Sequence, residues 1–373
     1  MTIYDWLVIG GGITGAALAY ELQAQGNKVL LLEPNSNLNN ATRYSYGGLP
    51  FWATSPETKE LCAEGMSIHR QLPEILDCDT EFQEINLLLT IKKNESPEKI
   101  LKQYQSCEIP PQLLSVAESC ELEPLLNPSA IAGAIYFPHG HINPVKTNEA
   151  YLKTFTRLGG TMIHESVNSF QFHQETVVGA KTDQNTYRAD KTVVCAGGLT
   201  RRLLKQSSVT VPVYFTHAEL LETPPLDLKL NTLIMPAHDQ RLRLEAKATA
   251  LEQESLWDQP EEDLGSAVID PGAIQFRDGH LCIGQISRTL TDPNSKVDAT
   301  ASEAWLREEI GTLLPALKDV PAQWHSCLIA FSPNRESTIG KLEEYDGIYV
   351  FSGFTSPLLL APPLARRFAR SVS

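Results

Sequence analysis

Three glycines and one acid near the amino terminus have the types and the spacing needed to bind a dinucleotide. The glycines, Gly10, Gly12 and Gly15, form a G-x-G-x-x-G pattern. Gly10 permits a tight turn, Gly12 lets the backbone approach a pyrophosphate, and Gly15 lets a helix pack closely on a strand. Glu33 follows 23 residues after Gly10, where a carboxylate can accept hydrogen bonds from a ribose diol. These residues predict a site for the ADP half of a cofactor.

The segments around the glycines have the order of elements that such a site needs. Residues 3–9 form an apolar run that predicts a strand, and residues 14–25 favour a helix. Gly26 stands where a left-handed C-cap is common, and a second apolar run over 29–32 ends directly before Glu33. This order makes the motif far more specific than the glycines alone. NAD and FAD both bind such a turn, so the turn leaves both open.

Composition excludes some classes of function. The 373 residues carry 31 Lys and Arg against 45 Asp and Glu, a net charge of -14, so we expect no nucleic-acid partner. The seven cysteines include no CxxC pair, which argues against a disulfide framework, and we predict no metal site. No basic leader precedes the first strand, and no apolar run reaches transmembrane length. We therefore expect a cytoplasmic protein with two domains and no membrane span.

Later segments fall in an order that resembles one family. They are Asn40-Ala-Thr-Arg-Tyr-Ser-Tyr-Gly-Gly48, Gly140-His-Ile-Asn-Pro144, Val167, the apolar run 191–195 with Ala196-Gly197-Gly198, and Gly347-Ile-Tyr-Val-Phe-Ser-Gly-Phe-Thr355. This order resembles the D-amino-acid oxidase superfamily of FAD-dependent oxidoreductases, most closely its monomeric sarcosine oxidase and glycine oxidase branch. The resemblance covers nearly the whole chain and favours FAD over NAD.

The resemblance also implies a fold. It is an α/β fold, α+β overall, with a Rossmann-like FAD-binding domain and a second domain built on an antiparallel sheet. We expect the FAD-binding domain to be assembled from residues 1–50, 140–208 and 327–373. Residues 51–139 and 209–326 would form the substrate domain.

Motif and resemblance together predict the residues that bind FAD. They are Gly10, Gly12, Ile13, Thr14, Gly15, Glu33, Pro34, Thr42, Arg43, Ser45, Val167, Ala196, Gly197, Cys327, Gly353, Thr355, Ser356, Pro357 and Leu358. In the resemblance Val167 contacts the adenine, and Ala196-Gly197 turns across the cofactor. Pro362-Pro363 suit the first turn of a last helix running to Val372, whose N-terminus would face the flavin pyrimidine.

Cys327 resembles the cysteine that carries a covalent thioether to the flavin in sarcosine oxidases. The alternative is a buried, unreactive cysteine, because free cysteine is among the most buried residue types. Covalent and non-covalent FAD are therefore both open.

The basic residues that bind a substrate carboxylate in this family are not found at the corresponding positions. In this register Ile329 replaces the arginine of glycine oxidases, while Leu360 and Tyr46 replace a lysine and an arginine of sarcosine oxidases. Either the substrate lacks a carboxylate, or another cation binds it. The available cations are Arg43, Arg241, Arg243 and Arg277.

Two residues are candidates for catalysis. Tyr46 occupies the position of a substrate-binding arginine, and His217 follows a predicted strand where an imidazole could transfer a proton at neutral pH.

We predict an FAD-dependent oxidoreductase that takes a hydride from a small amine or amino-acid-like substrate, by C–N oxidation, onto flavin N5. The alternative is a flavin-binding assembly or interaction protein with little or no turnover, which would have a protein partner. An NAD dehydrogenase that uses the same turn is a third reading.

Overall fold

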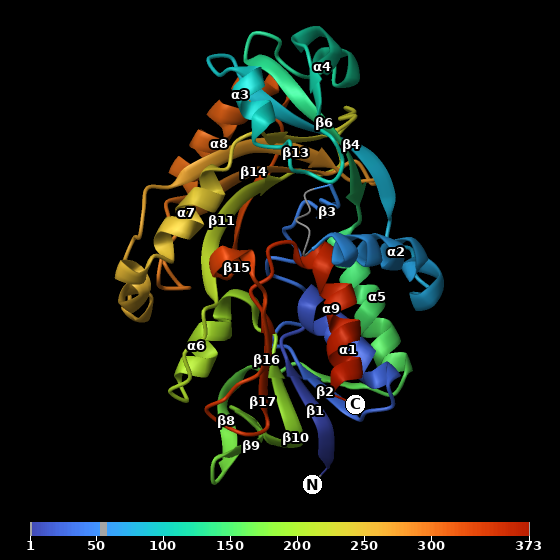
Figure 1. Cartoon of the computed structure of the whole chain (residues 1–373), viewed down its shortest axis with the longest axis vertical. Coiled ribbons are helices and arrows are strands. Elements are labelled where there is room, and N and C mark those ends of the chain that lie inside the picture. Colours follow the sequence, from blue (N-terminus) through green and yellow to red (C-terminus); the bar gives the residue numbers. More distant parts are fainter. Residues whose placement is uncertain (1, 53–57, 373) are drawn as a thin grey trace.

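Two β-sheets organise the chain, one below the other in Figure 1. The computed structural model describes residues 2–52 and 58–372, so residues 53–57 of the predicted substrate domain lie outside the described residues. The lower sheet has eight strands, with β16, β17, β10, β1, β2 and β7 side by side and the β8–β9 hairpin attached to β10. Its strands are β1 (Ile3–Ile9), β2 (Val29–Leu32), β7 (Thr161–Ile163), β8 (Val167–His173), β9 (Thr176–Thr182), β10 (Thr186–Val194), β16 (Thr338–Lys341) and β17 (Ile348–Ser352).

The upper sheet has nine strands and curves over the lower one (Figure 1). Its order is β15, β11, β14, β13, β12, β4, β6 and β3, with β5 paired to β6. The strands are β3 (Gly48–Leu49), β4 (Gln83–Lys92), β5 (Gln112–Leu114), β6 (Ile131–His141), β11 (Tyr214–Glu222), β12 (Leu233–Pro236), β13 (Val268–Gln275), β14 (Leu281–Arg288) and β15 (Gln323–Phe331). Its pairs are antiparallel except β12 with β4.

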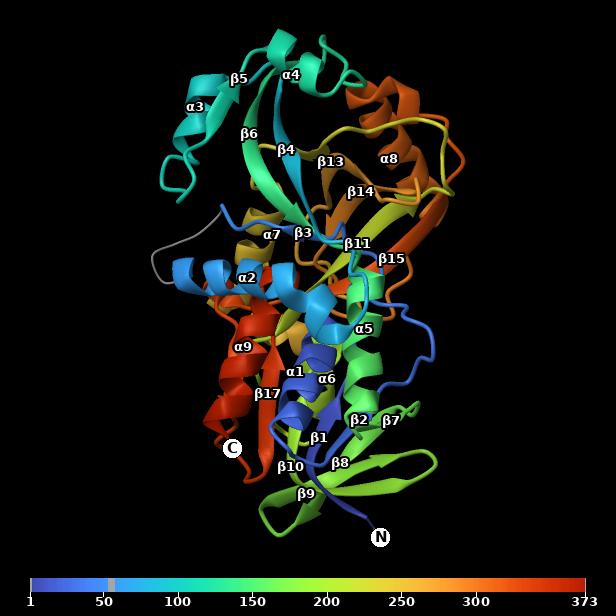
Figure 2. The ribbon, with the colours of Figure 1, turned by 90° about the vertical axis from the view of Figure 1, so that its right-hand side faces the viewer.

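Helices cover both sheets. The α-helices are α1 (Ile13–Ala24), α2 (Lys59–Leu76), α3 (Pro97–Lys102), α4 (Val116–Leu122), α5 (Pro144–Arg157), α6 (Thr200–Lys205), α7 (Gln240–Ala248), α8 (Ala299–Leu313) and α9 (Pro357–Ser371). Short 3-10 turns occupy Gly197–Leu199, Leu251–Asp258, Pro315–Leu317 and Pro333–Arg335. Figure 2 shows α1, α5 and α9 together over one face of the lower sheet, with α2 crossing between the two sheets. Within the described residues, no helix combines the length and the apolar character needed to cross a membrane.

The parallel core of the lower sheet explains why the second half of β1 is continuously apolar. Trp6 and Val8 of β1 pack with residues of α1 and α9, while Leu7 and Ile9 pack in a separate cluster on the opposite face. All four side chains are buried. A strand covered on both faces has no position where a polar side chain could reach water.

The predicted fold class is confirmed, and the strand, glycine turn, helix and strand at the amino terminus are as expected. The predicted domain boundary at residue 327 falls inside β15, which pairs with β11 in the upper sheet. The carboxyl-terminal segment returns to the lower sheet only with β16 and β17.

The expected start of the last helix was wrong. Helix α9 begins at Pro357, so Pro362 and Pro363 lie inside it. A proline at 362 cannot donate to the carbonyl of Leu358. His69 of α2 supplies the missing donor, because its Nε2 lies 2.7 Å from that oxygen. A tertiary hydrogen bond therefore replaces one that the helix loses.

Candidate functional site

The glycine turn after β1 leaves no room for side chains. Gly10 has a φ of +105°, and a Cβ there would lie 2.5 Å from the carbonyl oxygen of Cys195, at the end of β10. A Cβ on Gly15 would lie 1.9 Å from the carbonyl oxygen of Gly10. Both neighbours are backbone atoms that no rotamer change can move. The absence of side chains at Gly10 and Gly15 therefore lets β1 lie against the end of β10 and lets α1 start directly against the turn.

Glu33 closes the turn on the side of β2. One carboxylate oxygen accepts a hydrogen bond from the Gly11 amide at 2.7 Å, and the other accepts from the Asn35 amide at 3.1 Å. Asn148 of α5 donates to the carbonyl of Gly11 at 3.1 Å. A cavity of about 190 Å³ opens beside them, lined by Gly11, Glu33 and Arg43 among others. A buried carboxylate at the edge of such a cavity has the chemistry that a ribose diol needs.

The N-terminus of α1 is shaped for an anion. The side-chain oxygen of Thr42 accepts a hydrogen bond from the amide of Ile13 at 3.0 Å. Gly12 precedes the helix in extended conformation, without a side chain of its own to cap it. Free amides and the positive end of the helix dipole favour a phosphate at this position.

The structure gathers most of the predicted FAD-binding residues along one edge of the lower sheet. Those on or beside the glycine turn are Gly10, Gly12, Ile13, Thr14, Gly15, Glu33, Pro34, Thr42, Arg43, Ala196 and Gly197. Gly353, Thr355, Ser356, Pro357 and Leu358 follow β17, which pairs with β10. Val167 packs in the cluster that contains Leu32, next to Glu33. These segments follow the carboxyl ends of parallel strands, where such sheets bind ligands, so the chain fits FAD.

Gly353 marks where the chain leaves β17 for α9. Its φ is +74°, and a Cβ there would lie 1.9 Å from the Ser332 hydroxyl. Thr355 then donates to the carbonyl of Arg335 at 3.2 Å. The remaining predicted residue of the amino-terminal loop, Ser45, accepts a hydrogen bond from the amide of Gly47 at 3.3 Å.

The two faces of the upper sheet differ, and we name them by what they contact. The outer face includes Ile269 and Ile283 and packs on Leu306 of α8. The inner face includes Ile274 and Cys282 and packs with the loop that carries Tyr44, Tyr46 and Trp52. That loop directly follows Thr42 and Arg43 of the FAD-binding segment. The inner face is therefore the side on which a substrate would meet the cofactor.

Tyr46 reaches the inner face. Its hydroxyl lies 3.3 Å from the carbonyl oxygen of Gly272 in β13, to which it donates. Burial raises the pKa of this phenol well above its usual value. Tyr46 is therefore neutral and already hydrogen-bonded to the sheet.

His217, the second catalytic candidate, lies on the outer face. Its Nδ1 is 4.0 Å from Glu219, and Glu219 accepts from Arg288 at 2.7 Å. Arg288 also donates to Ser302 of α8 at 3.3 Å. His217 thus lies beside a polar network under α8, with its Nδ1 making no hydrogen bond, and does not share a face with Tyr46.

Arg241 is the cation that lies by the inner face. It extends from α7 and pairs with Glu245 one turn later, at 2.8 Å, and Thr216 of β11 donates to the same carboxylate at 2.7 Å. The charge of Arg241 also acts on the Cys327 thiol, whose pKa burial raises to about 12. Only the Nε of Arg241 is hydrogen-bonded within the described residues, which leaves its two terminal nitrogens for a ligand.

The other arginines considered from the sequence are committed to neighbouring carboxylates. Arg43 pairs with Glu222 at 2.7 Å. The side chains of Arg243 and Arg277 are largely exposed, and they pair with Asp239 and Asp79 at 2.7 and 3.2 Å respectively.

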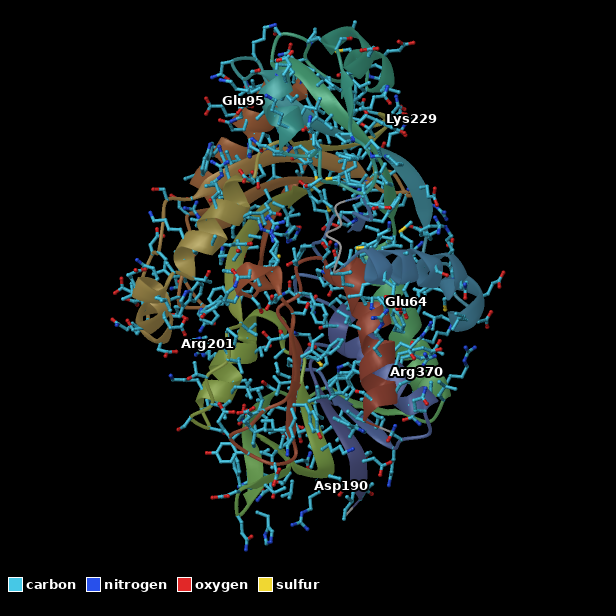
Figure 3. The ribbon with its side chains drawn as sticks, viewed as in Figure 1. Glu64, Glu95, Asp190, Arg201, Lys229 and Arg370 are labelled. Carbon is cyan, nitrogen blue, oxygen red and sulfur yellow. The ribbon has the colours of Figure 1, made fainter. Side chains whose placement is uncertain are left out.

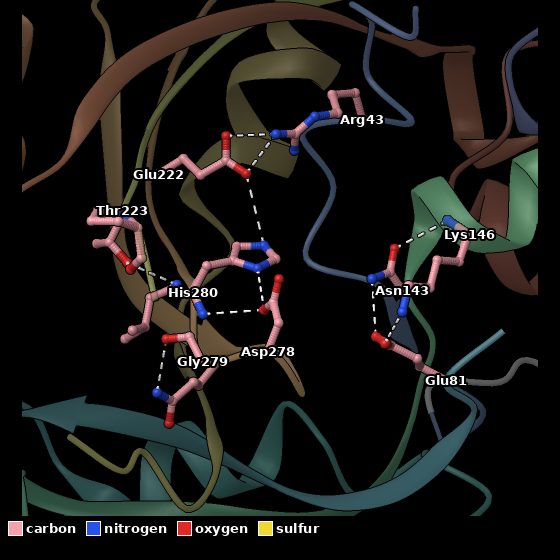
Figure 4. A network of polar contacts seen from close by, with 12 residues as sticks. Arg43, Glu81, Asn143, Lys146, Glu222, Thr223, Asp278, Gly279 and His280 are labelled. Carbon is pink, nitrogen blue, oxygen red and sulfur yellow. Dashed lines mark hydrogen bonds and ion pairs between the residues drawn. The ribbon is translucent and has the colours of Figure 1, made fainter. Parts of the chain in front are cut away.

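Glu222 joins Arg43 to a group of side chains that also has metal-ligand spacing. Figure 4 shows Arg43, Glu222, His280 and Asp278 in one chain of contacts, opposite Glu81, Asn143 and Lys146. Ligand atoms of Glu222, His280 and Cys282 lie within 4.8 Å of one another. Arg43 contacts both carboxylate oxygens of Glu222, at 2.7 and 2.8 Å. A cation is thus already paired with that carboxylate.

Two histidines of β6 lie beside the loop of Tyr46. Trp52 donates to Nδ1 of His139 at 2.9 Å. Burial lowers the pKa of His139 to about 3 and that of His141 to about 4. Both imidazoles are therefore neutral at physiological pH.

Asp270 is a buried acid of the upper sheet that the sequence analysis did not single out. It lies at a bulge of β13, between Ile269 and Gly272, 3.4 Å from Nδ1 of His238. Its charge acts on Tyr46 of the inner face and on Arg241, which places it on that side of the sheet. Burial raises the pKa of its carboxyl to about 6, and Arg241 opposes this shift. The only signal in the sequence is one acid in an otherwise apolar run, Ile269-Asp270-Pro271-Gly272.

Comparisons with known proteins agree with this geometry. The family model described as FAD dependent oxidoreductase matches residues 5–371. A curated relative, 4-methylaminobutanoate oxidase (formaldehyde-forming) from Paenarthrobacter nicotinovorans, is 26% identical over 386 residues, which cover 98% of this chain and 43% of the relative. The chain thus spans less than half the length of that relative.

Solved structures share the fold. Glycine oxidase from Bacillus cereus superposes with a TM-score of 0.77 at 22% identity, over 98% of this chain and 96% of the other. L-alpha-glycerophosphate oxidase from Mycoplasma pneumoniae, solved with FAD bound, has a TM-score of 0.76 at 18% identity, over 100% of this chain and 95% of the other.

Proposed function

Because this chain belongs to the family of FAD-dependent oxidoreductases, we propose that it oxidises a C–N bond of a small amine or amino-acid-like substrate. Bound FAD would supply the hydride acceptor, flavin N5. The substrate would lie between the flavin and the inner face of the upper sheet.

The observation that carries the proposal is the position of Arg241. The positions where related oxidases have basic residues hold Ile329, Leu360 and Tyr46, and Tyr46 is hydrogen-bonded to Gly272. Arg241 approaches the same face from α7, with its terminal nitrogens available. A guanidinium at a partly buried site matches a carboxylate in charge and in geometry.

The chain's own contribution would be binding and orientation. Hydride transfer depends on holding the C–H bond close to the acceptor, more than on an acid or a base. Tyr46, with its ring packed on the inner face, would form one wall of the substrate site. His217 has no role in this proposal, because it contacts Glu219 under α8.

Anaerobic reduction of the purified yellow protein tests the proposal. A panel of amines, amino acids and 2-hydroxy acids is added without oxygen, and the flavin absorbance is followed. We expect bleaching by an amine that carries a carboxylate. If no compound bleaches the flavin while a protein co-purifies with the chain, the interaction-protein alternative is correct instead. Admitting oxygen afterwards distinguishes an oxidase from a dehydrogenase.

The attachment of FAD to Cys327 stays a prediction with two outcomes. Cys327 lies in β15, opposite Ala218 of β11. Two residues earlier on the same strand, His325 stacks on Tyr44 with ring centres 4.7 Å apart, so this face of β15 is directed to the loop beside the FAD-binding residues. Acid precipitation decides the matter: covalent flavin stays yellow in the pellet, and free flavin stays in solution.

A further inference from the structure

The Asp270 carboxylate lacks the hydrogen bonds that a buried acid needs. Its side chain is only 18% exposed, and its Oδ1 atom is buried without a hydrogen-bond partner. His238 is nearby, at 3.4 Å, yet both of its ring nitrogens are also buried without a hydrogen bond. Buried polar groups in folded proteins are almost always satisfied, so an exception of this kind requires an explanation.

The neighbours of Asp270 do not neutralise it. Arg241 of α7 pairs through its Nε with Glu245, whose own negative charge raises the pKa of Asp270. Lys92 at the end of β4 acts on Asp270 only at a distance, since the two form no ion pair. Burial lowers the pKa of His238, which keeps that imidazole neutral. The described residues therefore leave a carboxylate without a compensating donor on the inner face.

Asp270 also lies within the substrate region. Its charge acts on the phenol of Tyr46, and Gly272, two residues further along β13, accepts the hydrogen bond from Tyr46. Its charge and that of Arg241 act on each other. One acidic and one basic group thus stand on the same apolar face, each with unused hydrogen-bonding capacity.

We propose that Asp270 binds the cationic amine group of the substrate while Arg241 binds its carboxylate. This inference rests on the proposed C–N oxidation and names its substrate class: a zwitterion in which an ammonium or secondary-amine cation and a carboxylate are both present. Oxidation would require the bound amine to give one N–H proton to the Asp270 carboxylate as the C–H hydride leaves for the flavin, so that the substrate becomes an iminium. The N–H groups of the cation satisfy the carboxylate, and the charge pair is formed away from water, where it is strongest.

The alternative is that Asp270 is a buried, protonated acid with a structural role. A protonated carboxyl would be indifferent to a ligand's charge, and its replacement by the isosteric amide would leave binding unchanged. The two readings therefore predict opposite results for Asp270→Asn.

Three probes test the amine end and the carboxylate end of the ligand independently. They are 4-methylaminobutanoate, N-methylbutylamine, which lacks the carboxylate, and butanoate, which lacks the amine. Binding to the FAD-loaded protein is measured without oxygen, by calorimetry and by the change in the flavin spectrum. We expect Asp270→Asn to weaken the two amines about 10- to 100-fold and to leave butanoate unaffected or bound more tightly.

A double variant tests whether Arg241 binds the carboxylate end of the ligand. Arg241→Gln combined with Glu245→Gln removes the ion pair as a unit, so that neither member of that pair is left as an unpaired charge. It should weaken butanoate and 4-methylaminobutanoate but not N-methylbutylamine. Asp190→Asn, at an exposed position far from the upper sheet (Figure 3), is the control and should bind all three probes as the wild type does.

The pH dependence gives an independent readout. Wild-type affinity for the amines should fall as the pH drops through about 6, because Asp270 becomes protonated, and Asp270→Asn should abolish that dependence. Equal binding of amines by wild type and Asp270→Asn would overturn the inference, as would failure of the wild type to bind any probe. If the amines bind through Asp270 but no substrate bleaches the flavin, the proposed oxidation is wrong and the binding site stands.

Discussion

The nucleotide-binding turn and the inner face of the upper sheet treat buried polar groups in opposite ways. At the turn, Glu33 accepts from Gly11, Thr42 accepts from Ile13, and Asn148 donates to Gly11. On the inner face, Asp270 and His238 have buried atoms without hydrogen bonds. The carboxylate of the turn is thus paired within the chain, although Asn148 keeps one buried atom, Oδ1, without a hydrogen bond, whereas the carboxylate of the inner face is unpaired. Folding itself supplies the donors for Glu33, whereas in our proposal a ligand supplies the donor for Asp270.

The largest effect is expected at the turn, from Gly15→Ala. The new Cβ would lie 1.9 Å from the Gly10 carbonyl oxygen, so α1 must move away from the strand. We expect a loss of about 3 kcal/mol or more in the free energy of unfolding, and loss of bound FAD. Flavin content per polypeptide and urea unfolding measure both.

Gly26→Ala is the matched control for this change. Gly26 has a positive φ, of +88°, unlike the helical Gly15, but a Cβ there meets nothing within 4 Å. It should cost about 1 kcal/mol and leave FAD bound. Equal flavin content in Gly15→Ala and the wild type would contradict the close-packed turn.

Replacing Asp270 on the inner face should raise the free energy of unfolding, whereas Gly15→Ala lowers it. Because the pKa of Asp270 is raised from 3.8 to about 6, the ionised acid destabilises the fold above pH 6. Asp270→Asn removes that penalty and should stabilise the substrate-free protein by about 3 kcal/mol near neutral pH. The gain should shrink as the pH falls through 6 towards 4, where the wild-type acid is protonated. Urea unfolding across this pH range measures it, and a destabilised variant would contradict the contrast between the regions.

His69 serves the fold, as the polar groups of the turn do. His69→Leu leaves the carbonyl of Leu358 without its donor and should cost about 2 kcal/mol, whereas His69→Gln keeps a donor and should cost less. Burial lowers the pKa of His69 to about 4 from 6.5. Its contribution is therefore full above pH 6.5 and is lost as the pH falls below that, opposite to Asp270. Thermal unfolding of the three proteins against pH tests this.

The smallest effect is expected from Thr42→Val. Valine keeps the shape but loses the oxygen that accepts from the Ile13 amide. We expect a loss of about 1 kcal/mol in stability and modestly weaker FAD binding. Thr42→Ser, which keeps the oxygen, should bind FAD as the wild type does; weakening in both variants would argue that the methyl group matters instead.

The sequence predicted the glycine turn and its acid because these parts are local. Gly10, Gly12, Gly15 and Glu33 lie within one strand, turn, helix and strand, so short-range spacing fixes their geometry. The start of α9 was predicted wrongly because it depends on a contact between residues far apart in the chain. Two prolines looked like a helix start, but a histidine from a distant helix supplies the donor that Pro362 lacks.

The sequence named Tyr46 and Arg241 as candidates, but their arrangement with Asp270 in the proposed substrate site was decided by the tertiary structure. Tyr46, Arg241 and Asp270 come from a loop, a helix and a strand far apart in the chain, and only the pairing of β12, β13 and β14 brings them to one face. The face of His217 was also not predictable. His217 directly follows Thr216 in β11, so the two side chains point to opposite faces of the sheet. Which face a strand residue occupies depends on what covers the sheet, and spacing along the sequence does not carry that information.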